Sequence, residues 1–133
     1  MEQLSKLTTR PKRTLARRLN RNSRIVKAII QAVQEKKGEQ LALLDLRRIP
    51  EAVSDYFLIC EATSQTQVKA IADFVEWHVK QVLGEIPYRH EGLQHAHWVL
   101  IDYVSIVVHV MLPETRKFYK LEELWSDAVM DAL

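Results

Sequence analysis

The chain is poor in the residues that phosphate-binding loops, disulfide scaffolds and membrane spans require. It has three glycines and a single cysteine in 133 residues. The glycines stand alone at positions 38, 84 and 92, so they cannot form a glycine-rich phosphate loop. One cysteine excludes an internal disulfide, and no apolar stretch approaches the roughly 20 residues of a bilayer-spanning helix. We therefore expect a soluble protein of a reducing, cytoplasmic compartment, with no membrane partner and no cofactor.

The composition is that of one globular domain. At 133 residues the chain can bury one core, and 47% hydrophobic with 27% charged residues excludes a wholly disordered chain. Cys60 stands in an apolar run with no metal-ligating neighbour in sequence. We expect it to be a small buried hydrophobe.

The charges divide the chain into two parts. Residues 1–24 carry eight basic residues against one acid, a net charge of +7, whereas the remaining residues carry eleven basic and sixteen acidic residues, a net charge of −5. A basic arm on an acidic body suits a partner with both kinds of surface, such as nucleic acid beside a basic protein. We place a disordered arm at residues 1–21 and a folded domain at residues 22–133. A solubilising tail and an organelle transit peptide are the alternatives for the arm.

Hydrophobic periodicity predicts alternating helices and strands. Apolar residues at helical spacing predict a helix that Asn22 or Ser23 caps and Gly38 ends, and a second helix from Ser64 to Gly84 with a capping box. A short terminal helix is expected around Leu121. The predicted strands are residues 41–46, 56–60, 98–103 and 105–112. This order indicates an α/β fold, a single domain with a mixed β-sheet flanked by helices.

Two sets of side chains invite a catalytic or metal-binding interpretation. Asp45 and Asp55 lie near the ends of two adjacent predicted strands and could imitate a metal-holding carboxylate pair, but capping or ion pairing with Arg47 and Arg48 is the more ordinary role. His95 and His97 would share one face of a strand and could begin a zinc site. The spacing supplies no third ligand, so surface imidazoles are favoured, and we predict no metal and no catalytic residue.

The strand that starts at Trp98 offers a candidate interface. Trp98, Leu100 and Asp102 alternate onto one of its faces. An aromatic residue with an apolar neighbour and a polar rim is typical of an interface anchor. Burial of both faces under helices is the alternative.

Five segments follow one another in order over about residues 25–127: DYFLIC at 55–60, EG at 91–92, WVLIDY at 98–103, VVHV at 107–110 and RKFYKLEELW at 116–125. Together they resemble the ribosomal silencing factor family, also called Iojap or RsfS. The resemblance implies a nucleotidyltransferase-like fold without the catalytic residues. It also implies a binding protein that docks on ribosomal protein fourteen of the large ribosomal subunit, sterically blocks subunit association and represses translation.

The resemblance transfers the interface to Trp98, which belongs to the family motif. Leu100, Asp102 and Met111 are its expected neighbours, and Pro87 and Tyr88 are expected to border the patch. The basic arm is expected to contact ribosomal RNA. Two alternatives remain: a nucleotidyltransferase-like enzyme that uses Asp45 and Asp55, and an RNA-binding module that works through the arm. The sequence leaves open whether the free protein forms a homodimer.

The chain departs from the family pattern at four positions. Ala62 and Ala96 stand where relatives usually have glycine, and Val104-Ser105 stands where they have a Gly-Asp pair. Valine resists a positive φ, so we expect the hairpin geometry there to be altered.

Overall fold

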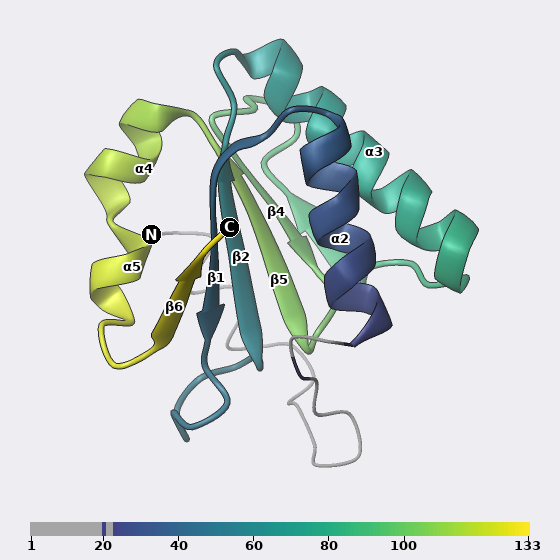
Figure 1. Cartoon of the computed structure of the whole chain (residues 1–133). Coiled ribbons are helices and arrows are strands. Elements are labelled where there is room, and N and C mark those ends of the chain that lie inside the picture. The colour runs from purple at the N-terminus through teal and green to yellow at the C-terminus, as the bar shows by residue number, and fades with distance from the viewer. Residues whose placement is uncertain (1–19, 21–22) are drawn as a thin grey trace.

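The apolar runs form a six-stranded sheet in the order β3-β4-β5-β2-β1-β6 (Figure 1). The computed structural model describes residue 20 and residues 23–133, and most of the predicted arm at residues 1–21 lies outside them. Among the described strands, β2 and β5 pair in parallel and the other neighbours pair antiparallel, which confirms the mixed sheet. The strands are β1 (Glu39–Asp45), β2 (Tyr56–Glu61), β3 (Arg89–Glu91), β4 (Trp98–Asp102), β5 (Ile106–Met111) and β6 (Val129–Ala132).

Helices cover both faces of this sheet. We call the side covered by the two long helices the first face and the opposite side the second face (Figure 1). Two contacts join the long helices: His78 Nε2 lies 3.3 Å from Gln31 Oε1, and the Lys36 amine lies over the Phe74 ring. The later residue of one helix thus meets the earlier residue of the other, so the two helices run antiparallel. The first face carries α2 (Arg24–Glu35) and α3 (Gln65–Leu83), and the second carries α4 (Pro113–Tyr119) and α5 (Leu121–Leu124).

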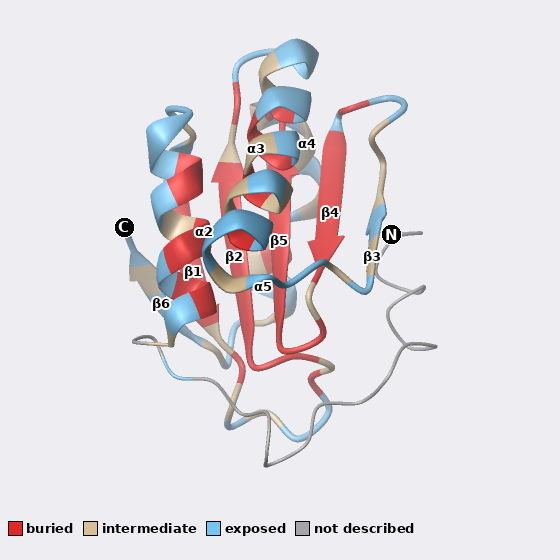
Figure 2. Cartoon of the chain, turned by 90° about the vertical axis from the view of Figure 1, so that its right-hand side faces the viewer, coloured by how far each residue is buried: buried red, intermediate tan, exposed pale blue. Residues whose placement is uncertain are grey.

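Each face has its own core because successive strand residues point to opposite sides. The core of the first face is the larger, and α2 and α3 both contribute to it. The core of the second face is smaller and includes Phe57, Trp98, Leu100, Met111 and Leu121. In Figure 2 the central strands β2, β4 and β5 are coloured as buried. A sheet buried on both sides explains why its strands are continuous apolar runs.

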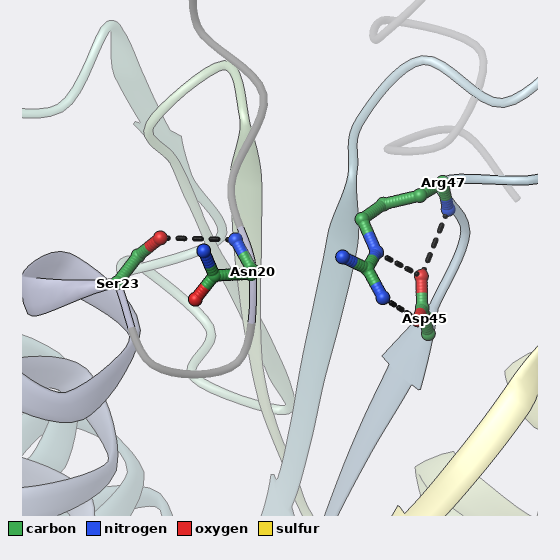
Figure 3. A network of polar contacts seen from close by, with 4 residues as sticks. All are labelled: Asn20, Ser23, Asp45 and Arg47. Atoms are coloured by element: carbon green, nitrogen blue, oxygen red, sulfur yellow. Dashed lines mark hydrogen bonds and ion pairs between the residues drawn. The ribbon is translucent and has the colours of Figure 1, made fainter.

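The caps agree in part with the prediction. Ser64 accepts a hydrogen bond from the Gln67 backbone N–H at 3.1 Å, and Gly84 ends α3 in the left-handed conformation. At α2, Ser23 occupies the N-cap position without a side-chain cap bond, because its hydroxyl accepts the Asn20 N–H instead (Figure 3). Gly38 follows α2 at a crowded position, because a Cβ atom there would lie 2.5 Å from Val33 Cγ1.

Left-handed turns lie at both ends of β4. Ala96, before the strand, has φ 54°, and Val104, after it, has φ 72°. Both are positions where glycine was expected from the resemblance, and a positive φ is strained for alanine and more so for a β-branched side chain. Ala62 is not among the residues with positive φ. The altered residues therefore keep the backbone that glycine would adopt at two of these turns.

The two edge strands were not predicted. β3 has three residues and β6 has four.

In the described residues, no helix combines the length and the hydropathy that a membrane crossing requires.

Candidate partner-binding site

The predicted interface strand lies inside the molecule. Trp98, Leu100 and Asp102 share the second face as expected, but all three are buried, and so is Met111, which pairs with Trp98. Of the two alternatives for this strand, the structure therefore shows burial, and Leu100, Asp102 and Met111 offer no exposed contact area. These side chains are buried because the chain turns at Leu112 and places α4 and α5 across the second face, where Leu121 joins the core.

One edge of Trp98 nevertheless reaches the surface. Its side chain is 5% exposed and lines a hollow of about 390 Å³, which we call the aromatic hollow. Tyr119 forms part of the wall, with its ring centroid 4.9 Å from that of Trp98. The lining residues are Gly92, His95, His97, Trp98, Glu114, Thr115, Phe118 and Tyr119.

Phe118 is the most exposed large hydrophobic side chain of this hollow, at 77%. It contacts Tyr119 edge to face, with ring centroids 5.0 Å apart. Sequence reasoning missed Phe118 as an interface residue, although a signal was present. Consecutive residues of a helix point about 100° apart, so the side chain next to a partly buried Tyr119 on this short helix can point toward solvent.

Pro87 and Tyr88 do not border the aromatic hollow. The Tyr88 N–H donates to the Asp102 carbonyl at 2.8 Å, which places it at the end of β4 opposite to Trp98. Four residue steps along a strand separate these ends by roughly 13 Å. Tyr88 is exposed and Pro87 is half-buried, but the structure does not bring them to Trp98.

Asp102 holds the turn that follows β4. Its Oδ1 accepts the Val104 backbone N–H at 2.8 Å, and its Oδ2 lies 3.7 Å from Arg89 Nε, an ion-pair distance. The carboxylate stabilises a strained turn between β4 and β5 and is not exposed as the polar rim of an interface.

The two carboxylates of the enzymatic alternative lie in different surroundings, Asp45 in contact with Arg47 and Asp55 in the interior. Arg47 donates to Asp45 three times, from its backbone N–H, Nε and a terminal guanidinium nitrogen, at 3.0, 2.9 and 2.7 Å (Figure 3). These bonds to Arg47 hold the pKa of the Asp45 carboxyl below its ordinary value. The predicted ion pairing of Asp45 with Arg47 is confirmed. Asp55 is buried, one residue before the start of β2.

The histidines do not converge. His95 and His97 are exposed in the loop before β4, with ring centroids 6.5 Å apart, and His90 pairs with Glu76 at 2.8 Å. Among the residues that the structure describes, no three His, Cys, Asp or Glu side chains gather as a metal site would require. Cys60 is fully buried as predicted, and burial raises the pKa of its thiol to about 12.

The fold and the aromatic hollow define a small α/β domain with aromatic side chains around an open hollow at its surface. More particularly, the chain belongs to the ribosomal silencing factor family RsfS: the model of the "Ribosomal silencing factor during starvation" family matches residues 20–132. A ribosomal silencing factor RsfS from Halalkalibacterium halodurans is 41% identical over 107 residues, 80% of this chain and 90% of that protein. One from Bacillus subtilis is 38% identical, over 78% of this chain and 86% of that protein.

A solved structure agrees with the fold. The crystal structure of a Chromobacterium violaceum protein, 33% identical, superposes with a TM-score of 0.72 over 77% of this chain and 83% of that one. The family resemblance and the single mixed α/β domain are thus confirmed. Membership in this family also confirms the prediction that the chain is not an enzyme.

Proposed function

We propose that this chain binds the large ribosomal subunit through ribosomal protein fourteen, blocks joining of the small subunit by its bulk, and so represses translation in the cytoplasm. The observation that carries the proposal is the aromatic hollow, in which Trp98, Phe118 and Tyr119 meet beside an open surface. Aromatic side chains are enriched at protein interfaces, and Trp and Tyr are frequent among the few residues that dominate the binding energy once a partner excludes water from them. Relatives named ribosomal silencing factor support the choice of the ribosome as the partner.

The binding surface is centred on Trp98 and extends to α4. Leu100 and Met111 act from beneath as packing that supports the Trp98 ring, because both are fully buried. Phe118 supplies the exposed contact area. A steric mechanism needs affinity and bulk and no chemistry at the site, which agrees with a hollow that is open and aromatic.

Charge supports the same partner. The residues after position 24 have a net charge of −5, which favours approach to a basic ribosomal protein and mainly raises the association rate. The basic arm, residues 1–21, carries seven basic residues against one acid, a net charge of +6, and is proposed to touch ribosomal RNA. Deleting residues 1–20 is expected to weaken binding and to make its salt dependence shallower, as measured by cosedimentation at several salt concentrations. Complete loss of binding would favour an RNA-binding module that works through the arm.

The experiment is a subunit-joining assay with purified ribosomal subunits and this protein in excess. We expect the wild-type chain to keep the subunits apart and to cosediment with the large subunit. Phe118→Ala is expected to weaken binding about tenfold or more without unfolding the domain, because the side chain is 77% exposed. Ile86→Ala is the matched control, since Ile86 is 70% exposed and lies outside the hollow lining.

Two results would contradict the proposal. Subunits that join normally at a saturating concentration of the protein would exclude the steric mechanism. Equal affinity of the wild-type, Phe118→Ala and Ile86→Ala proteins for the large subunit would exclude the aromatic hollow as the interface. Trp98→Ala is less suitable as the primary test, because the Trp98 side chain is 5% exposed and its removal also leaves a cavity.

A further inference from the structure

A buried histidine lies directly behind the aromatic hollow. His109, on β5, is fully buried on the second face. It pairs with Leu100 across the sheet, so it is the diagonal neighbour of Trp98. Its ring also lies 4.6 Å, centroid to centroid, from that of Phe57. His109 does not line the hollow, so a partner in the hollow would not touch it.

His109 holds Trp98 by a hydrogen bond. The Trp98 indole Nε1–H donates to His109 Nδ1 at 3.0 Å, and both residues are buried. An indole nitrogen can only donate, so Nδ1 must be unprotonated and the neutral imidazole must carry its proton on Nε2. Burial favours this neutral form, because it lowers the pKa of His109 to about 3.

Packing alone does not explain a histidine at this position. Its Nε2 is buried and has no hydrogen-bond partner among the described residues. Burying an imidazole with one nitrogen unsatisfied costs free energy that an apolar side chain of similar size would avoid. The bond to Trp98 is the polar contact that the ring does make.

We propose that His109 is a positioning residue: by accepting the Trp98 N–H, it holds the indole in one orientation at the floor of the aromatic hollow. This inference rests on the proposed function, in which Trp98 contacts the ribosomal partner. An indole that is already held in its bound orientation loses less conformational freedom on binding. The interface is therefore ordered before the partner arrives.

The test compares His109→Leu with His109→Asn. Leucine removes the acceptor, whereas the asparagine side chain can place its amide oxygen near the position of Nδ1. For His109→Leu we expect the Trp98 indole N–H to exchange faster with water, as measured by NMR. We also expect a roughly 3- to 10-fold weaker Kd for the large subunit, the range that ordering one side chain represents. His109→Asn is expected to restore both.

A control and a second variant separate positioning from general stability. Tyr103→Phe removes the Tyr103 hydroxyl, another buried polar group that has no hydrogen-bond partner among the described residues, and it should leave both readouts unchanged. Trp98→Phe keeps an aromatic ring but has no N–H to donate. If the His109→Leu variant does not fold, the Trp98→Phe variant is still expected to bind the large subunit more weakly than the wild type. If the His109→Leu variant folds, the double variant should bind no more weakly than Trp98→Phe alone.

The outcomes distinguish this inference from the proposed function. Wild-type protein that does not bind the large subunit overturns both. Wild-type protein that binds, together with His109→Leu of equal affinity or a His109→Leu penalty that persists in the Trp98→Phe background, overturns the positioning role alone. Faster exchange and weaker binding that asparagine rescues support it.

Discussion

The two faces of the sheet are built for different tasks. The first face lies under α2 and α3, which have 12 and 19 residues, and its core is apolar. The second face lies under α4 and α5, which have seven and four residues, and it contains the buried polar side chains of Asp102 and His109. The comparison indicates that the first face supplies most of the free energy of unfolding. On the second face, some of the buried volume is taken by polar side chains, among them His109 behind the aromatic hollow.

The largest expected effect falls on the first face. Ile71 is fully buried on α3, so Ile71→Ala should lower the free energy of unfolding by about 4 kcal/mol, through lost burial and the cavity left behind. Urea denaturation measures this, with the exposed Ile86→Ala as the control for the same change. The affinity of the folded protein for the large subunit should not change. A loss of affinity in the folded protein would contradict the division between the faces.

A polar residue of the second face comes next. Asp102→Ala removes the acceptor of the Val104 N–H and the carboxylate beside Arg89, and should cost about 3 kcal/mol in unfolding free energy. Asp102→Asn keeps an oxygen for the Val104 N–H and should cost clearly less. Equal losses in the two variants would show that the hydrogen bond to the turn does not matter.

Acid should lower the free energy of unfolding through His109, which is buried on the second face. Its pKa is about 3 in the folded protein and near 6.5 in the unfolded chain, so below pH 6.5 the unfolded chain binds a proton that the folded one excludes. The contribution of the neutral His109 to the free energy of unfolding is therefore complete above pH 6.5, and it falls by about 1.4 kcal/mol for each pH unit below that value. Between pH 7 and pH 5 the wild type should lose about 2 kcal/mol more than His109→Asn in urea denaturation. Equal losses would exclude a buried neutral imidazole.

The smallest effect is expected outside both cores. Asp45 and Arg47 form a part-exposed pair at the end of β1, with side chains 23% and 37% exposed. Asp45→Asn should cost less than about 1 kcal/mol, because solvent screens such a pair. Thermal unfolding at low and high salt measures it, and a loss as large as that of Asp102→Ala would make the ranking wrong.

The sequence predicted the elements that carry a long periodic signal. The helix from Ser64 to Gly84 and the central strands follow from apolar spacing that a single core can use. β3 and β6 could not be predicted, because strands of three and four residues carry almost no period and form only where a longer strand offers its edge. Trp98 was assigned to the correct face, but the choice between an exposed and a buried face could not be made, since it depends on where the turn at Leu112 directs α4.

The location of the aromatic hollow along the chain has a consequence for its formation during synthesis. Its floor comes from β4, whereas Phe118 and Tyr119 lie on α4, and the edge strand β6 pairs with β1 from the far end of the sequence. Ribosomes make the amino end first, so all the strands but β6 exist before this wall does. A nascent chain interrupted before Pro113 would contain β1 to β5 but not the wall of the aromatic hollow, so the hollow is completed only in the last stretch of translation.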